Sequence, residues 1–275
     1  MAGREARTMT AIDAAAVESL HQLTGGWRPL VLDADPAADV RDLPGVAVRW
    51  AESRFAFWNC TTLTEDGLGA DLLPERLAQA AAIMREKRGT GFLWLFAGLL
   101  TPEARAGLPA AAERAGLDLA FSGEGVAGDV LPLPDPEHPL LEFTRVRTEE
   151  QLLAYADLNS RAYGFPLADG RDGLARSELW RTDVHAYLGL RDGVPVTAAA
   201  TVPCAGRLFV LMVATDPAQG RQGFGEAVTR KALHEGGRAT GLTRATLHAT
   251  AAGAPVYRRI GLAPNTPIHF YALRS

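Results

Sequence analysis

The residues with the clearest potential for chemistry form a glycine-rich loop, GRQGFG, at positions 220–225. An apolar run before it predicts a strand over 208–213, and the four-residue spacing of Phe224, Val228 and Ala232 predicts a helix after it. The first backbone N–H groups of a helix have no partner within the helix, and glycines let a phosphate approach them closely. Because Arg221 adds a positive charge, this strand–loop–helix unit predicts an anion site.

Two common nucleotide-binding patterns do not fit this loop. A P-loop needs a lysine followed by serine or threonine, whereas Gly225 is followed by Glu226 and Ala227. The dinucleotide pattern GxGxxG fails because Gly223-x-Gly225 continues to Val228. A tight packing turn without a ligand remains an alternative.

The loop resembles motif A of the GNAT superfamily, the acyl-coenzyme A dependent N-acyltransferases. In the family pattern, Gln/Arg-x-x-Gly-x-Gly/Ala, Gly223 and Gly225 occupy the two small positions, whereas Gly220 replaces the usual Gln or Arg. The family binds the coenzyme A pyrophosphate through backbone N–H groups of this loop and the pantetheine along the preceding strand. The resemblance therefore implies that the co-substrate acetyl-coenzyme A is bound by Val213, Ala214, Thr215, Gly220, Arg221, Gln222, Gly223, Phe224 and Gly225.

A second motif follows in the order that the family shows. Tyr257, Gly261 and Leu262 match the Tyr-x-x-x-Gly-Phe signature of motif B, with Leu in place of Phe. In the family this tyrosine protonates the departing coenzyme A thiolate, so the resemblance implies that Tyr257 is the catalytic general acid. Thr250 stands where many members have Asn or Ser in contact with the coenzyme. The predicted elements over 141–275 also follow the complete GNAT order, which implies a mixed α/β fold.

No general base is evident from the sequence. An alkylamine acceptor has a pKa near 10, so a base or a water chain is expected, but the strand before the loop carries no carboxylate. His185 and His248 are candidates, each with packing or surface exposure as the alternative. Asp216, before Pro217, is better explained as a turn residue. Cys204 is better explained as a small packed residue than as a nucleophile.

A segment between two predicted helices, at 149–164 and around 174–180, predicts a substrate-binding loop, AYGFPLADGRDG at 162–173. Its Tyr163 and Phe165 lie near Asp169 and Asp172, and carboxylates beside an aromatic wall suit a cationic amine. The alternative is a solvated loop with its aromatic residues folded onto the core.

A proline-rich stretch at 132–139 separates two predicted domains, 1–135 and 141–275, joined by a linker at 136–140. The first half has the element order of a GNAT domain without its phosphate loop, and the corresponding loop carries Glu65, Asp66 and Asp71, which would repel a pyrophosphate. We therefore predict a degenerate GNAT-like domain, as in tandem GNAT proteins; an unrelated α/β domain is the alternative. Its predicted elements are helices at 11–23 (ended by Gly25-Gly26), 73–89 and 101–117 (interrupted at Pro109), and strands at 46–50, 54–58, 92–98 and within 118–133.

Composition excludes several classes of protein. The net charge of -4 and the absence of a Lys/Arg-rich run argue against nucleic-acid binding. The longest apolar run, 92–100, is about half of what a membrane helix needs. Two distant cysteines predict neither a disulfide framework nor a zinc site, so we expect a cytoplasmic protein without metal. The combined prediction is an N-acetyltransferase for a small-molecule amine, with a non-catalytic acyl-coenzyme A sensor or a peptide or protein N-acetyltransferase as alternatives; the sequence does not indicate an oligomeric state.

Overall fold

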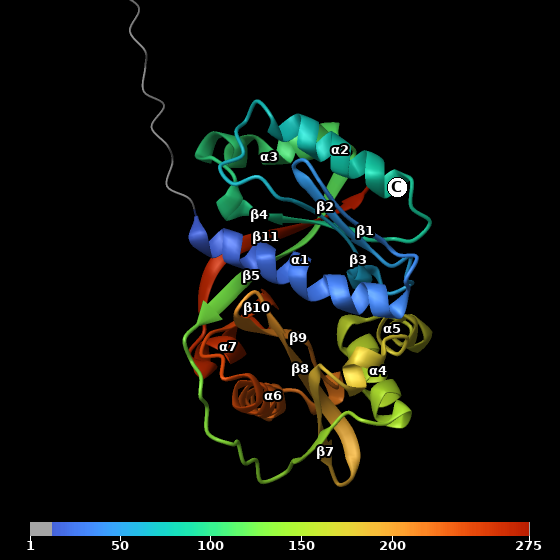
Figure 1. Cartoon of the computed structure of the whole chain (residues 1–275), viewed down its shortest axis with the longest axis vertical. Helices are drawn as coiled ribbons and strands as arrows, with labels where there is room; N and C mark the ends of the chain where they lie inside the picture. The colour runs from blue at the N-terminus through green and yellow to red at the C-terminus, as the bar shows by residue number, and fades with distance from the viewer. Residues whose placement is uncertain (1–12, 275) are drawn as a thin grey trace, which may run out of the picture.

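A computed structural model describes residues 13–274, which form a three-layer α/β structure around one mixed sheet (Figure 1). The eleven strands lie in the order β1-β2-β3-β4-β11-β5-β10-β9-β8-β7-β6. They are β1 (Asp39–Leu43), β2 (Val46–Trp50), β3 (Asn59–Leu63), β4 (Phe92–Phe96), β5 (Leu117–Gly128), β6 (Glu142–Arg145), β7 (His185–Arg191), β8 (Val194–Cys204), β9 (Arg207–Thr215), β10 (Ala245–Thr250) and β11 (Ala263–Leu273). The helices are α1 (Ala14–Ala34), α2 (Leu73–Arg85), α3 (Pro102–Arg114), α4 (Glu149–Tyr163), α5 (Leu167–Leu174), α6 (Phe224–Thr240) and α7 (Ala254–Ile260).

The two halves of the chain repeat one arrangement of elements and exchange their last strands. In the first half β3 is followed by α2, β4, α3 and β5; in the second, β9 is followed by α6, β10, α7 and β11. β11 pairs with β4 and β5, and β5 pairs with β10, so each final strand lies between strands of the other half. This arrangement confirms the predicted GNAT-like order of the first half. The division of the chain into separate domains at 1–135 and 141–275 stays a prediction.

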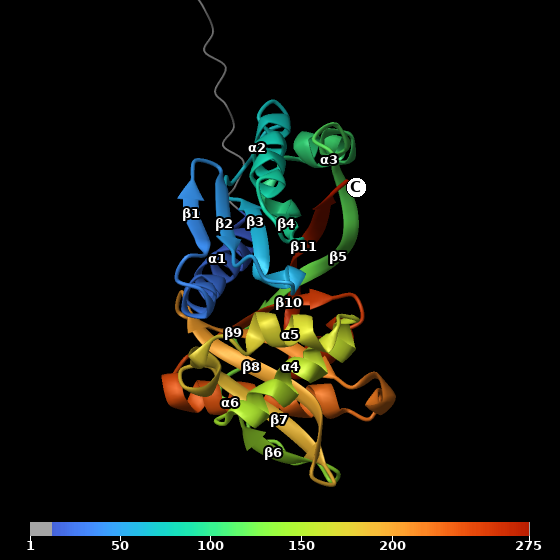
Figure 2. The same ribbon diagram turned by 90° about the vertical axis from the view of Figure 1, so that its right-hand side faces the viewer.

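The helices cover the two faces of this sheet in a way that the strand pattern explains. Alternate residues of a strand point to opposite faces. On β9, Phe209 and Leu211 pack in the core that includes α1 and α4, whereas Leu208 and Val210 pack in the core that includes α6 and α7. A third core holds α2 and α3 against the first-half strands. Figure 2 shows the two halves stacked along the continuous sheet.

Helix α1 connects the two halves and corrects the first predicted helix. Asp13 caps its N-terminus by accepting from the N–H groups of Ala15 and Ala16; the predicted start at 11 lies outside the described residues. The helix continues through Gly25-Gly26 to Ala34 instead of ending there. A Cβ atom at Gly26 would lie 2.9 Å from the Phe209 ring, so the glycine that predicted a helix end serves close packing against β9.

Other elements also differ from their predictions. Residues 56–58 form a 3-10 turn rather than a strand, and the neighbouring β3 begins at Asn59. Helix α3 continues through Pro109. Most of the predicted loop at 162–173 is helical, because α5 occupies 167–174, and a 3-10 turn at 178–181 replaces the predicted second helix. Within residues 13–274, no helix is long and apolar enough to cross a membrane.

Candidate active site

The site is built around a gap between two parallel strands, β9 and β10. They pair only from Leu208 to Val210 and from Ala245 to Leu247, and no pairing between them is found farther along in the described chain. A bulge in β9 bends it away: Met212 has φ 50°, and the register against β8 shifts between Ala198 and Ala200. The strands therefore separate where a sheet would otherwise be continuous.

Hydroxyl groups hold the carbonyl groups of the bulge. Tyr155 of α4 donates to the Met212 carbonyl at 2.8 Å, and Tyr163 at the end of α4 donates to the Val213 carbonyl at 2.8 Å. Thr197 of β8 donates to the Ala214 carbonyl at 2.9 Å. Three consecutive carbonyl oxygens of the predicted pantetheine strand are thus fixed by neighbouring side chains. Burial raises the pKa of Tyr163 to about 12, so its hydroxyl keeps the proton that it donates.

The predicted phosphate loop follows β9 and leads into α6. The helix begins at Phe224 without a side-chain cap, and Gly223 before it has φ 79°, a conformation that favours glycine. Arg221 and Gln222 are exposed beside it. A Cβ atom at Gly225 would lie 3.1 Å from the Thr215 hydroxyl, so this glycine keeps the helix close to the strand end. Uncapped N–H groups beside small, exposed residues fit the pyrophosphate of coenzyme A.

The departure at Gly220 has a structural explanation. Its φ is -64°, which any residue adopts, and an added Cβ atom would meet only the Pro217 carbonyl oxygen, at 3.5 Å. The backbone at this position therefore does not require glycine, and it would accept the Gln or Arg of the family pattern.

His138 of the proline-rich linker supports the loop, a role that its sequence context did not suggest. Its Nε2 lies 3.1 Å from the Gln222 carbonyl oxygen, which can only accept, so Nε2 carries the hydrogen. Its Nδ1 accepts from the Leu140 N–H at 3.3 Å, and its ring packs edge-on against Phe224 at 5.1 Å. The linker thus fixes the outer side of the phosphate loop.

Tyr257 and Thr250 lie together at the end of the gap. Tyr257, on α7, packs in the same core as Val210, on the α6 and α7 face of the sheet. A Cβ atom built at Gly253 would lie 3.6 Å from both the Tyr257 and the Thr250 hydroxyl oxygens. Burial raises the pKa of Tyr257, and the nearby Tyr163 raises it further. The Tyr257 hydroxyl is therefore protonated at neutral pH.

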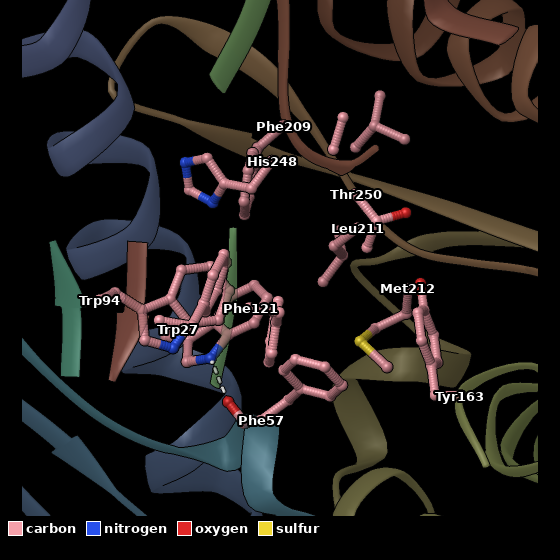
Figure 3. A pocket seen from close by; sticks show the side chains of 13 residues that line it. Trp27, Phe57, Trp94, Phe121, Tyr163, Phe209, Leu211, Met212, His248 and Thr250 are labelled. Atoms are coloured by element: carbon pink, nitrogen blue, oxygen red, sulfur yellow. Dashed lines mark hydrogen bonds between the residues drawn. The ribbon is translucent and has the colours of Figure 1, made fainter. Parts of the chain in front are cut away.

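A cavity opens on the opposite face of the same gap (Figure 3), and we call it the acceptor cavity. Residues 210–212 of β9 and 248–250 of β10 form one side of it. Aromatic rings form the rest: Trp27, Phe57, Trp94, Phe121 and Phe270 come from other elements, and Phe209 comes from β9. The sequence analysis named none of these rings as part of a site. Tyr163, which it named as a substrate-site candidate, also lines the cavity. The rings come from six separate elements, so no local motif unites them.

His248 is the only histidine in this wall. Its Nε2 lies 3.1 Å from the Ser19 carbonyl oxygen, which fixes the hydrogen on Nε2 and leaves Nδ1 as an acceptor. Nδ1 has no hydrogen-bond partner among the described residues. Burial lowers the pKa of His248 to about 4, so the ring is neutral at physiological pH.

The remaining predicted residues lie outside the acceptor cavity. Phe165 packs against Phe55 and Phe57 at ring distances of 4.8 and 5.8 Å, behind the cavity wall. His185 belongs to β7, two strands from β9 in the sheet. Asp216 caps a turn, as predicted, and forms an ion pair with an arginine of α4.

The acidic residues of the predicted substrate loop and the cysteine also have structural surroundings. Asp172 accepts from the Ser53 hydroxyl at 2.8 Å and from the Arg54 N–H at 2.9 Å, which holds α5 against the first half. Asp169 lies 3.7 Å from an Arg54 nitrogen, and neither acid lines the acceptor cavity, so the structure does not place them at its aromatic wall. Burial raises the pKa of Cys204 to about 11, which agrees with a packed residue and not with a nucleophile.

In the first half, the loop between β3 and α2 corresponds to the predicted phosphate loop between β9 and α6. Backbone hydrogen bonds within the chain occupy part of it. Leu68 forms a parallel bridge with Leu100: its N–H donates to the Leu99 carbonyl at 2.9 Å, and its carbonyl accepts from the Thr101 N–H at 3.0 Å. Glu65 lies in the same loop and forms two hydrogen bonds with Arg76. One N–H group and one carbonyl group of this loop are thus already bonded within the chain, and the Glu65 carboxylate lies in the same loop.

Comparisons with known proteins identify the class of fold. No protein-family model matches the sequence, and no curated protein matches it. A GCN5-related N-acetyltransferase from Kribbella flavida is 21% identical, with a TM-score of 0.69 and coverage of 95% of this chain and 96% of its own. A GCN5-related N-acetyltransferase from Sphaerobacter thermophilus is 14% identical, with a TM-score of 0.59 and coverage of 84% and 78%. A tandem GNAT protein from the clavulanic acid biosynthesis pathway is 14% identical, with a TM-score of 0.50 and coverage of 72% and 68%. The chain therefore has the GNAT fold, as its two motifs predict.

Proposed function

We propose that the protein is an acetyl-coenzyme A dependent N-acetyltransferase that acts on the amine of a small molecule. One observation carries this proposal. The gap between β9 and β10 has an uncapped phosphate loop at its strand end, the protonated Tyr257 on one face and the acceptor cavity on the other. A thioester in the gap and an amine in the cavity can then meet directly, without a covalent enzyme intermediate.

The residues present fit acetyl-coenzyme A, whose thioester supplies the acyl group. The N–H groups at the start of α6, with Arg221 beside them, would hold the pyrophosphate. The backbone of 213–215 would hold the pantetheine, because β10 leaves this part of β9 unpaired on that side. Thr250, across the gap, would contact the same arm.

Tyr257 fits the role of general acid by its position and its protonation. The amine nitrogen attacks the carbonyl carbon, the C–N bond forms, and the C–S bond breaks. The Tyr257 hydroxyl, which is protonated at neutral pH, donates its proton to the leaving sulfur. The nitrogen releases one proton, which passes through water and restores the Tyr257 hydroxyl, so the products are the amide and the coenzyme A thiol.

The shape of the cavity favours a small acceptor over a peptide or protein. The cavity volume is about 70 Å³, and rings from both halves of the chain line it. This small volume limits how much of an acceptor can enter.

Two cysteines that form no disulfide agree with a reducing, cytosolic setting.

The first test is calorimetric titration of acetyl-coenzyme A into the wild type, Gly223→Glu and Gly67→Glu. Both glycines are exposed, with φ 79° and 68°, so the two substitutions cause comparable backbone strain and add the same charge. We expect Gly223→Glu to abolish binding and Gly67→Glu, in the corresponding first-half loop, to preserve it. Equal effects of the two substitutions, or no binding to the wild type, would refute the assignment of this loop.

A second test separates an enzyme from a sensor. Tyr257→Phe should keep the affinity for acetyl-coenzyme A and lower turnover by about 10²-fold or more, the range typical of a lost general acid. Binding without acyl transfer by the wild type, across a series of amines, would favour the sensor.

A further inference from the structure

The wall of the acceptor cavity is aromatic and carries no ionised side chain. Among residues 13–274, none of those that line it is Asp, Glu, Lys or Arg. The rings pack on one another: Phe121 stacks on Phe270 at 4.2 Å, and Trp94 meets Phe270 at 4.5 Å. Such a wall offers flat apolar surface to a ring and no counter-ion to a cation.

Carboxylates near the cavity are committed to other partners. Asp172 is bonded to the first half, as described above. Glu124 borders a different surface hollow, next to the exposed end of β10, and pairs with Arg258 at 3.3 Å. Neither residue lines the acceptor cavity.

Two nitrogen atoms in the cavity wall have no hydrogen-bond partner among residues 13–274. One is Nδ1 of His248, an acceptor, because Nε2 donates to the Ser19 carbonyl. The other is Nε1 of Trp94, which can only donate; Trp94 itself is 4% exposed. Buried polar atoms are normally bonded, so an unpaired donor and acceptor in one wall point to a ligand with complementary groups. Both atoms are covered by their neighbours in this structure, so a ligand reaches them only after a side chain of the wall has moved.

These features distinguish between the charged and the neutral forms of an amine. An ammonium ion entering this cavity would lose its hydration and find no carboxylate, and ring faces return only part of that cost. A neutral amine loses much less hydration, and its N–H group can bond an acceptor in the wall. An aromatic amine is already neutral at physiological pH, because its lone pair is delocalised into the ring.

We propose that the acceptor is an aromatic amine, uncharged at neutral pH, whose ring lies against the aromatic wall and whose N–H group donates to Nδ1 of His248. This inference rests on the acyl transfer proposed above. It also accounts for the missing general base, since such an amine needs no deprotonation before attack. As the C–N bond forms and the C–S bond breaks, the nitrogen loses one proton and the sulfur gains one, which balances the transfer.

The size of the cavity identifies a side chain that must move. A cavity of about 150 Å³ holds a benzene ring, and the acceptor cavity, at about 70 Å³, is smaller. Met212 lies in its wall beside Tyr163 (Figure 3). Its unbranched side chain can adopt other rotamers more readily than the surrounding rings. Displacement of this side chain would admit the ring.

The test uses two isomeric amines that differ in charge. Para-ethylaniline is neutral at about pH 7, and para-methylbenzylamine has the same atoms but is an ammonium ion. We measure the binding of each to the full chain by calorimetry, first without acetyl-coenzyme A. We expect the aniline to bind at least about tenfold more tightly, and the difference to shrink as the pH rises toward the pKa of the benzylamine. Tighter or equal binding of the benzylamine, or binding of neither, would overturn the inference.

Two variants of His248 test the proposed hydrogen bond. His248→Gln keeps an N–H group that can reach Ser19 but removes the acceptor at Nδ1, whereas His248→Asn places an amide oxygen near Nδ1. We expect Gln to weaken binding of the aniline about threefold to tenfold and Asn to restore part of it. Equal losses in both, accompanied by equal losses of thermal stability, would indicate a structural role only.

These measurements separate this inference from the proposed function. If acetyl-coenzyme A binds but the aniline does not, the transferase proposal stands and the aromatic acceptor is refuted. If the aniline binds but acetyl-coenzyme A does not, the cavity has the proposed specificity and the transferase proposal fails.

Discussion

The hydrogen bonds that two tyrosines donate to the bulge of β9 can be tested by matched substitutions. Tyr155 and Tyr163 come from one helix and donate to successive carbonyl groups of this bulge at the same distance, 2.8 Å. They differ in burial, because Tyr155 is fully buried whereas Tyr163 is partly exposed. The same substitution, Tyr→Phe, therefore removes equivalent hydrogen bonds in different surroundings.

The expected magnitudes follow from this difference in burial. In Tyr155→Phe the Met212 carbonyl loses its donor where water cannot replace it, which costs about 1–3 kcal/mol of the free energy of unfolding. In Tyr163→Phe the lost bond joins two residues that are each partly exposed, so we expect water to replace the donor after the substitution and the loss to be only about 0.5–1 kcal/mol. Because the bulge also shapes the gap, Tyr155→Phe should raise KM for acetyl-coenzyme A in the proposed reaction.

The assay is urea unfolding of both variants and the wild type, followed by fluorescence and circular dichroism. The difference in midpoint, at an unchanged dependence on urea, gives the loss of stability. A loss for Tyr163→Phe equal to or larger than that for Tyr155→Phe would refute the argument from burial. A stable Tyr155→Phe variant with unchanged KM would refute the role of the bulge.

Three further predictions concern the loop, the contact between the halves and the exchanged strands. Gly220→Gln should leave stability unchanged and bind acetyl-coenzyme A at least as tightly as the wild type, as calorimetry would show. The Glu18 carboxylate has a lowered pKa, chiefly because Arg244 donates hydrogen bonds to it. Its stabilisation is therefore present above its unfolded pKa, near 4.5, and is lost as pH falls through the lower folded value. Urea unfolding should thus show Glu18→Gln about 2 kcal/mol less stable than the wild type at pH 7, and the difference should shrink below about pH 4. A fragment of residues 136–275 should be insoluble alone, because it lacks β4 and β5, which leaves β11 unpaired and exposes one edge of β10; solubility restored by co-expression with residues 1–135 would support the exchange.

The sequence predicted those parts of the fold that local motifs determine. The strand–loop–helix unit around Gly223, the order of elements and the position of Tyr257 on a helix each depend on residues close together in the chain, whereas the roles of this loop and of Tyr257 stay predictions. The exchange of β5 and β11 depends instead on which strand edges pair in the folded sheet. The alternating apolar pattern of a strand predicts which face is buried, but it does not specify the neighbouring strand. The double glycine of α1 shows the same limit, because only the Phe209 ring on a distant strand explains why a helix runs through it.

The residues that line the acceptor cavity could not be predicted from the sequence for a related reason. Trp27, Trp94 and Phe121 lie far apart in the sequence and meet only after the two halves share one sheet. The properties of His248 depend on a carbonyl of α1 that fixes its tautomer and on burial that keeps it neutral. Its position on a strand therefore made it a candidate without indicating what it could do.

The two halves share one arrangement of elements and differ in the loops that follow β3 and β9. In the first half, Leu68 of this loop bonds across to Leu99 and Thr101. The first half does not keep an open loop at this position. Its α1, β4 and β5 instead supply rings to the acceptor cavity of the other half, and β5 completes that half's sheet beside β10. Because the strand that joins the halves also carries Phe121 of the cavity wall, changes in their packing would alter acceptor binding before they alter the phosphate loop.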